Sequence, residues 1–182
     1  MKKIILTFGL ISGVLISLMM ALTVPFHDKI GVNHSYVVGY ATIVLSLLLS
    51  FFGIRSYRDS VSNGHITFGK AFLVGLAITV ISCICYVVTW EVIYYNFMPD
   101  FMDKYAANVI DKMKAAGATA AAIQQKTDEL SDFKMKYKNN LLFNIAMTFI
   151  EPFPVGLVIT LISAAVLRKK PQSRPDQSPS AA

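Results

Sequence analysis

Charged side chains are scarce in this sequence. Asp, Glu, Lys and Arg make up 15% of its 182 residues, whereas 54% are hydrophobic and the mean hydropathy is +0.53. Soluble domains carry roughly 25% charged residues, so this shortage argues against an ordinary soluble protein. A membrane protein is the interpretation that the composition indicates.

Proline and charge are also missing from most of the long apolar runs. A bilayer core requires about 20 apolar residues in a helix, and four runs are of this kind: Ile4–Val24, Val37–Ile54, Ala71–Tyr95 and Leu141–Leu167. The first three contain no Pro, and Glu91 is the one charged residue in them. The sequence therefore predicts an all-α fold, an integral membrane four-helix bundle over residues 1–170. Residues 171–182 are rich in Pro, Ser and Gln and are expected to be a disordered cytoplasmic tail.

Metal-binding and disulfide patterns are absent as well. Cys83 and Cys85 are the two cysteines, and two positions along a helix place them about 200° apart, which argues against a shared metal or a disulfide. We interpret them as small packing residues. His27, Asp28 and His34 could ligate a metal, but their spacing matches no known site, and we interpret them as polar loop residues.

Catalytic motifs are missing too. The sequence has no phosphate loop, no HExxH, no G-x-S-x-G elbow and no credible pair of carboxylates. No basic patch interleaved with aromatic residues points to nucleic acid, and the net charge of +6 fits membrane topology and anionic headgroups. We therefore expect no enzyme, no cofactor and no nucleic-acid partner, and membrane lipid is the expected surrounding.

The distribution of Lys and Arg predicts the orientation. Short cytoplasmic loops retain positive charge. The N-terminus, the second loop and the C-terminal tail hold nine Lys and Arg against two Asp, whereas the two other connections hold eight Lys against seven acids. Both termini are therefore expected in the cytoplasm. The first apolar run is longer than that of a secretory signal peptide, so we expect it to remain as an uncleaved helix.

The connection over residues 96–140 is too long for a structureless loop. Pro99 favours a helix start, Gly117 breaks the run as a residue after a helix does, and Thr119 can cap a second helix. We predict an extracytoplasmic αα-hairpin over about residues 100–140, between the third and fourth spans. Alanines near its tip offer little apolar area to bury, so the tip should fray or bind a partner.

Small residues recur along one face of each predicted span. They are Gly9, Gly13 and Ser17 in the first, Ser46, Ser50 and Gly53 in the second, Ala71, Gly75, Thr79 and Cys83 in the third, and Gly156, Thr160 and Ala164 in the fourth. Helices in a bilayer associate mainly through close packing of such residues. We expect a compact intramolecular bundle, and the alternative is a homodimer through Gly9 and Gly13.

The fourth run differs because it carries Glu151, Pro152 and Pro154 near its centre. Proline removes backbone donors and disfavours helical geometry in the residue before it, so the helix should kink or break here, with Glu151 and Phe153 outside the helical region. If the span begins at Leu141, Glu151 lies about 15 Å deep, near mid-bilayer. A charge at that depth is expensive.

Two accounts of Glu151 remain open. In the first it is a structural plug, which accepts hydrogen bonds from freed N–H groups of the following half-helix or stays protonated. In the second it is a proton or cation site at a broken helix, as in transporters. Glu91 lies among Trp90, Tyr94 and Tyr95, an aromatic belt, and we expect it to be an interfacial anchor that reaches headgroups or water.

Three segments carry a resemblance: "ITFGKAFLVGLAIT" (66–79), "YYNFMPDF" (94–101) with "KMKAAGAT" (112–119), and "FIEPFPVGLVITLISAAVLRKK" (149–170). Together they resemble a bacterial inner-membrane family known as domain of unknown function family 4199, over nearly the whole chain to about Lys170. The resemblance implies four spans with a periplasmic helical hairpin in the inner membrane, and it implies no activity. Pro152 departs from the family pattern, in which an apolar residue usually follows the Glu.

The leading functional hypothesis is a structural or partner-binding membrane module. It would present the hairpin in the periplasm to a protein partner or to another copy of the chain. The alternative is a proton- or ion-coupled transport component that uses Glu151. A third possibility is an accessory subunit of a larger membrane complex.

Overall fold

The computed structural model describes residues 2–23 and 32–169, without the side chains of residues 32–36. Four stretches are long and apolar enough to cross a membrane: Lys2–Thr23, Val37–Val61, Phe68–Phe97 and Leu141–Leu167. The described residues form helices and no strand. The prediction of an all-α protein with four spans is confirmed, whereas the tail at 171–182 lies outside the described residues.

Eight helices make up this part of the chain. Their bounds are α1 (Lys2–Thr23), α3 (Val32–Leu47), α4 (Leu49–Val61), α5 (Phe68–Phe97), α6 (Phe101–Ala115), α7 (Ala120–Asn139), α8 (Leu141–Ile150) and α9 (Phe153–Leu167). The second span is thus formed by α3 and α4, and the fourth by α8 and α9. The second and third spans extend beyond the apolar runs that predicted them, and the fourth has the predicted bounds.

The second span shows why the predicted bounds were too short. Its helix continues past Ile54 to Val61 through a polar segment. Arg58 lies 2.7 Å from a carboxylate oxygen of Asp59, and Arg55 lies 3.8 Å from the other oxygen one helical turn away. The Arg55–Asp59 pair has the i, i+4 spacing that supports a helix, and polar residues of this kind lie outside what a hydropathy run detects.

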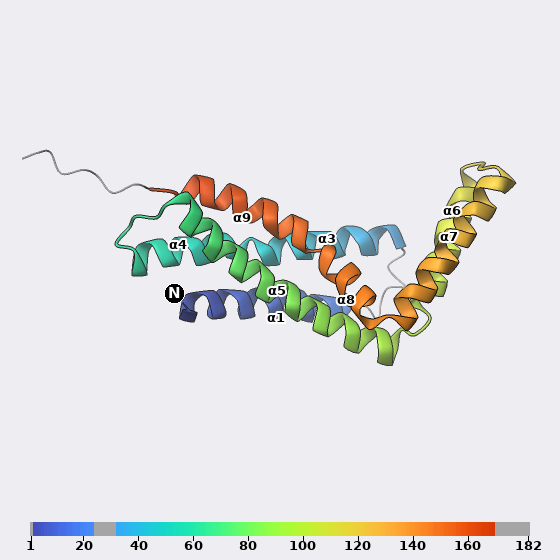
Figure 1. Ribbon diagram of the computed structural model, residues 1–182, viewed down its shortest axis with the longest axis horizontal. Helices are drawn as coiled ribbons and strands as arrows, with labels where there is room; N and C mark the ends of the chain where they lie inside the picture. Colours follow the sequence, from blue (N-terminus) through green and yellow to red (C-terminus); the bar gives the residue numbers. More distant parts are fainter. Residues whose placement is uncertain (1, 24–31, 170–182) are drawn as a thin grey trace, which may run out of the picture.

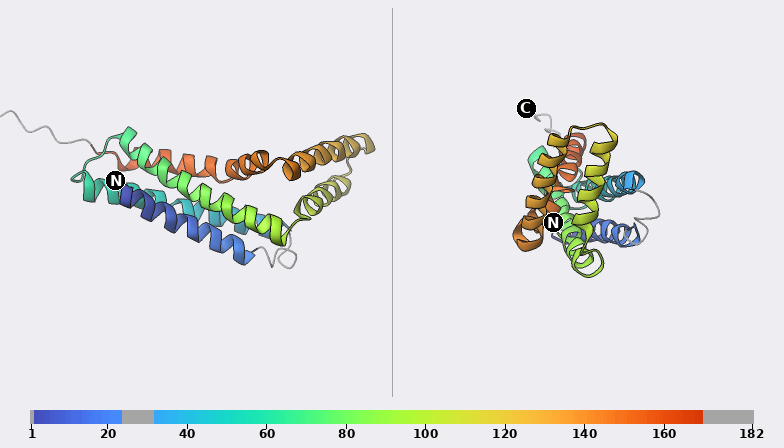
Figure 2. Two further views of the ribbon diagram at one scale, coloured as in Figure 1. Left: turned by 60° about the horizontal axis from the view of Figure 1, so that its bottom comes forward. Right: turned by 90° about the vertical axis from the view of Figure 1, so that its right-hand side faces the viewer.

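The long helix α5 is the centre of the bundle. It packs against α1, α4, α8 and α9, and α1 also contacts α3 and α4. Figure 1 shows the spans running along the long axis, with the start of α1 and the end of α9 at the same end. The α6–α7 pair, residues 101–139, extends from the opposite end (Figure 2). An even number of crossings places the start of α1 and the end of α9 at the same end of the bundle.

Small residues lie where the helices approach most closely. A Cβ on Gly9 would meet the side chain of Ile81 at 2.9 Å, and one on Gly13 would meet Cys85 at 2.6 Å. Both glycines therefore face α5 within the same chain, and this stripe is not a free surface for a second copy.

Glycines of the other spans are covered in the same way. A Cβ on Gly75 would meet Ile54 and Thr160 at 2.7 Å, and one on Gly156 would meet Thr79 at 2.3 Å. Thr79 and Thr160 also share a hydrogen bond of 3.1 Å between their hydroxyls. Close approach and buried polar contacts together join α5, α4 and α9, as expected for helices in lipid.

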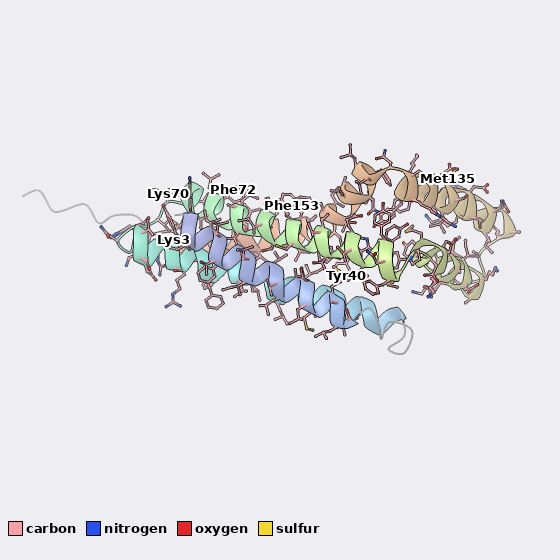
Figure 3. The ribbon with its side chains drawn as sticks, turned by 90° about the horizontal axis from the view of Figure 1, so that it is seen from below. Lys3, Tyr40, Lys70, Phe72, Met135 and Phe153 are labelled. Atoms are coloured by element: carbon pink, nitrogen blue, oxygen red, sulfur yellow. The ribbon has the colours of Figure 1, made fainter. Side chains whose placement is uncertain are left out.

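The end of the bundle that holds the start of α1 and the end of α9 also carries the loop between α4 and α5. Gly64 turns the chain at φ 78°, and the side chain of Thr67 accepts a hydrogen bond from the backbone of Lys70 and caps α5. Ile66 and Lys169 then exchange backbone hydrogen bonds of 2.9 Å. This pair fixes the end of α9 to the loop. Figure 3 shows Lys3 and Lys70 at this end and Met135 of the α6–α7 pair near the other.

Two helices and a short turn form the α6–α7 pair. Gly117, at φ 74°, follows α6, and Thr119 accepts a hydrogen bond from the backbone N–H of Ala122 at the start of α7. The predicted cap at Thr119 is confirmed. The two helices contact each other, and the ammonium of Lys134 pairs with the carboxylate of Asp103 between them.

Candidate functional site

The fourth span is interrupted at its acidic residue. Helix α8 ends at Ile150 and α9 begins at Phe153, so Glu151 and Pro152 form a turn between them. The expected break is confirmed. The expected backbone of Glu151 and Phe153 is wrong, because the φ of −69° and ψ of −58° at Glu151 are helical and Phe153 is the first residue of α9. Both α8 and α9 pack against α5. This packing keeps Glu151 helical although a residue before proline ordinarily prefers an extended backbone.

Glu151 has a hydrogen-bond partner on another span. The hydroxyl of Tyr86, on α5, donates to Oε2 of Glu151 at 2.8 Å, whereas no side-chain hydrogen bond caps α9. The expectation that Glu151 accepts from the following N–H groups is therefore wrong. A side chain with helical backbone geometry points toward the preceding turn, away from the start of α9.

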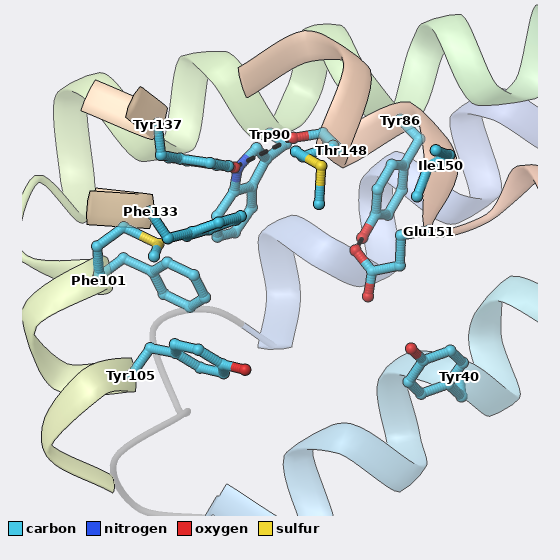
Figure 4. Close-up of a pocket in the computed structure, with 12 residues that line it drawn as sticks. Tyr40, Tyr86, Trp90, Phe101, Tyr105, Phe133, Tyr137, Thr148, Ile150 and Glu151 are labelled. Carbon is cyan, nitrogen blue, oxygen red and sulfur yellow. Dashed lines mark hydrogen bonds between the residues drawn. The ribbon is translucent and has the colours of Figure 1, made fainter. Parts of the chain in front are cut away.

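A cavity of about 590 Å³ opens beside this carboxylate. Twelve residues from five helices and the α8–α9 turn line it (Figure 4): Tyr40, Tyr86, Trp90, Phe101, Met102, Tyr105, Phe133, Tyr137, Met147, Thr148, Ile150 and Glu151. We call this space the aromatic pocket. It extends from the break in the fourth span to the base of the α6–α7 pair, so it joins the two features that the sequence singled out separately.

The chemistry of the aromatic pocket is simple. Seven of its twelve lining residues are aromatic, two are Met, and none is Lys, Arg or His. Glu151 is the one charged group among them. Its side chain keeps open surface, and the hydroxyl of Tyr40 on α3 is turned toward it across the space (Figure 4). The pocket therefore combines apolar walls with a single acidic end.

A chain of hydrogen bonds forms the wall farther from Glu151. The indole N–H of Trp90 donates to the hydroxyl oxygen of Tyr137 at 2.7 Å, and that hydroxyl lies 3.1 Å from the hydroxyl of Thr148. Thr148 in turn donates to Oδ1 of Asn144 at 3.3 Å. Burial raises the pKa of Tyr137 above its ordinary value, so its hydroxyl stays neutral and keeps its proton. The chain links α5, α7 and α8.

Ring contacts strengthen the same junction. Tyr137 packs edge-on against Tyr94 with centroids 5.4 Å apart, and Phe133 packs against Phe143 at 5.5 Å. Aromatic pairs of this geometry contribute about 0.5–1.5 kcal/mol beyond their buried area. The base of the α6–α7 pair is thus held on the bundle by hydrogen bonds and by ring packing.

Residues 7–169 match a family model described as "Protein of unknown function (DUF4199)". The chain belongs to this family. The predicted resemblance is confirmed over nearly the same length. No match was found among the curated proteins or among the solved structures.

Glu91 of this DUF4199 chain lies differently from the expectation. Both oxygens of its carboxylate are buried and have no hydrogen-bond partner among the described residues. We expected an anchor that reaches headgroups or water. Tyr137 of α7 hydrogen-bonds to Trp90, the neighbour of Glu91, and α8 packs against α5, so part of the predicted aromatic belt is an internal contact.

The remaining candidate residues form no site in the described part of the chain. No group of three or more His, Cys, Asp or Glu is placed there to hold a metal ion. His27 and Asp28, and the side chain of His34, lie outside the described residues. Cys83 is buried in the bundle and Cys85 packs on Gly13, each as a free thiol.

Sequence reasoning identified Glu151 and the break but missed the aromatic pocket. Two signals were present in the sequence. Tyr40 and Tyr86 place hydroxyl groups inside apolar runs, where each requires a polar partner. Tyr40, Tyr86 and Glu151 come together only when the second, third and fourth spans pack, and a local sequence pattern cannot predict this packing.

Proposed function

We propose that this DUF4199 protein is a partner-binding module of the bacterial inner membrane, with both termini in the cytoplasm and the α6–α7 pair displayed as a hairpin outside. One observation carries the proposal. The base of the α6–α7 pair is fixed to the bundle by the Trp90–Tyr137 hydrogen bond, whereas most residues of its tip, 115–122, are exposed. A rigid base with a free tip is suited to presenting a surface, and this role involves no catalysis.

The charge distribution supports this orientation. Arg55, Arg58, Lys70 and Arg168 belong to the end of the bundle that also holds the start of α1 and the end of α9. The α6–α7 pair extends from the other end and carries seven Lys against five acids, whereas the connections at the first end carry nine Lys and Arg against two Asp. Positive loops are retained in the cytoplasm, so the α6–α7 pair is assigned to the periplasm.

A shortened α6–α7 pair tests the proposal. Removing the whole pair would also remove one wall of the aromatic pocket, so we would replace only residues 109–127 with a short Gly-Ser loop. The proteins cross-linked to the full chain in intact cells should be lost from this variant. Trp90 is the single Trp, so unchanged fluorescence emission would show that the base is still folded. Identical partners for both proteins would contradict the proposal.

The partner could be a larger membrane complex, of which this chain would be an accessory subunit, or a second copy of the chain. An accessory subunit would remain bound to other membrane proteins in mild detergent, whereas a module that pairs with its own copy would appear as a homo-oligomer. Native mass spectrometry separates these cases by mass. A strictly monomeric chain with no partner would count against both.

A second function is favoured by Glu151 itself. Its carboxylate lies at a helix break, accepts a hydrogen bond from Tyr86, and opens on the aromatic pocket. Broken helices with a carboxylate hold protons or ions in transporters. Flux of protons and alkali cations into proteoliposomes should then fall in Glu151→Gln and persist in Asp132→Asn, which removes an exposed carboxylate of α7. Equal flux in all three proteins would eliminate transport through Glu151.

A further inference from the structure

We propose that the aromatic pocket binds an organic ammonium ion that carries an apolar body, with the charge at Glu151 and the body against the aromatic walls. This inference requires neither transport nor a protein partner. It would survive the failure of either function proposed above, because it concerns equilibrium binding to the pocket alone.

The sign of the charge follows from the lining residues. Glu151 is the one charged group among the twelve, and none of them is basic. The hydroxyl of Tyr86 donates one hydrogen bond to Oε2 of this carboxylate, which leaves the other oxygen available to a ligand. An isolated carboxylate at this depth in a span is costly, and a bound cation would offset that cost. An anionic ligand would be repelled.

The walls suit an organic cation in particular. Trp90 and Phe101 pack edge to face with centroids 4.8 Å apart, and Phe101 stacks on Tyr105 at 6.4 Å. The faces of such rings attract ammonium groups and are the usual recognition elements for quaternary ammonium ligands. Because these rings pack on one another, they are already ordered, and binding would cost little side-chain entropy.

The size of the pocket excludes simpler occupants. Its volume of about 590 Å³ is far larger than a dehydrated metal ion and lies within the roughly 300–1,000 Å³ of small-molecule sites. Metal ions such as Ca²⁺ or Mg²⁺ require several oxygen ligands, whereas the pocket offers one carboxylate and a few hydroxyls. A purely apolar ligand would leave the carboxylate unpaired. A molecule with both a cationic end and an apolar end matches every part of the lining.

A matched pair of probes tests the proposal on the full chain in an uncharged maltoside detergent. Benzyltrimethylammonium carries the cation, and its isostere with carbon in place of nitrogen carries the same shape without charge. Calorimetric titration gives affinities, and emission from Trp90, the single Trp and a wall residue, reports occupancy of the pocket. The cation should bind saturably and about tenfold more tightly than the isostere.

Two variants locate the binding site. Glu151→Gln should weaken cation binding about tenfold and leave the isostere unchanged, whereas Asp132→Asn should change neither. If Glu151→Gln does not fold, Tyr105→Leu provides the second test, because Tyr105 lies on α6 outside the bundle and the residue is 37% exposed. It should weaken binding of the cation several-fold more than binding of the isostere.

Measurements with added lipids distinguish two sources of the ammonium group, a lipid headgroup and a free cation. Mass spectrometry after addition of phosphatidylcholine or phosphatidylglycerol would show whether a lipid headgroup occupies the pocket. If phosphatidylcholine stays bound in the unmodified chain but not in Glu151→Gln, the ligand is a lipid headgroup. If benzyltrimethylammonium binds and no phosphatidylcholine is retained, the ligand is a free organic cation. Three results would overturn the proposal: equal affinity for the two matched probes, absence of saturable binding, or unchanged affinity for the cation in Glu151→Gln and Tyr105→Leu.

Discussion

At the scale of single residues, this membrane bundle depends on a few polar groups that find partners across helices. Hydrocarbon offers no water to unpaired groups, so a buried hydroxyl is stabilised by an acceptor within the protein. Ser12 donates to the backbone carbonyl of Ser46 at 2.7 Å, and Tyr86 donates to Glu151 at 2.8 Å. The second contact joins the third span to the break in the fourth, and it is therefore both structural and part of the aromatic pocket.

Tyr86→Phe should reduce the free energy of unfolding by about 1–3 kcal/mol, because Glu151 loses its hydrogen-bond donor while the ring is kept. Thermal unfolding of the purified chain in detergent measures the change. Tyr95→Phe is the matched control, since Tyr95 lies on the same helix and is 49% exposed. Equal losses in the two variants would contradict the assigned role of Tyr86.

Gly156→Ala tests close packing at one residue. The added Cβ would meet the side chain of Thr79 at 2.3 Å, so either this side chain or the two helices must shift, and we expect a loss of about 1–3 kcal/mol in unfolding free energy. Gly69→Ala is the control, because its Cβ would have no atom within 4 Å and Ala favours a helix by up to about 1 kcal/mol. Chemical unfolding in mixed micelles would compare them. A stable Gly156→Ala chain would show that the contact is loose.

At the scale of helices and their connections, local signals predicted most of what the structure shows. Hydropathy located the four spans, and Thr119 was identified as a cap because that signal lies within one turn of sequence. Errors arose where tertiary contacts overrode local preference. The backbone of Glu151 stayed helical against the effect of Pro152, and Glu91 became buried where α7 and α8 return to α5. The aromatic pocket depends on five helices and was beyond any local pattern.

Tyr137→Phe should loosen the α6–α7 pair from the bundle. The variant removes the acceptor of the Trp90 N–H and the link to Thr148, while the ring contacts remain. Hydrogen exchange in α6 and α7 should accelerate, and emission of Trp90 should change as its N–H loses its partner. Tyr105→Phe keeps the ring in the pocket wall and serves as the control. Unchanged exchange in Tyr137→Phe would mean that ring packing alone holds the base.

At the scale of the whole molecule, the protein is an elongated body with two distinct ends. One end gathers the start of α1, the end of α9 and the α4–α5 loop, and the other carries the α6–α7 pair (Figure 1). The aromatic pocket lies between these ends, at the junction of the bundle with the pair. Residues of α6 and α7 form part of the pocket wall, so a displacement of the pair on its base would change the shape of the pocket.

The proposed orientation, with both termini in the cytoplasm, yields a prediction for the whole chain. Reporters inserted after Gly117 should be active in the periplasm, and reporters fused after Lys169 should be active in the cytoplasm, because positively charged loops resist translocation. Replacing Arg55, Arg58 and Lys70 by Gln should reduce this bias and yield a mixed population, whereas replacing Lys112, Lys114 and Lys126 should leave it unchanged. An alkaline phosphatase and a fluorescent protein, each active on one side, measure both positions. Cytoplasmic activity at Gly117 in the unmodified chain would reverse the assignment and remove the α6–α7 pair from the reach of any periplasmic partner.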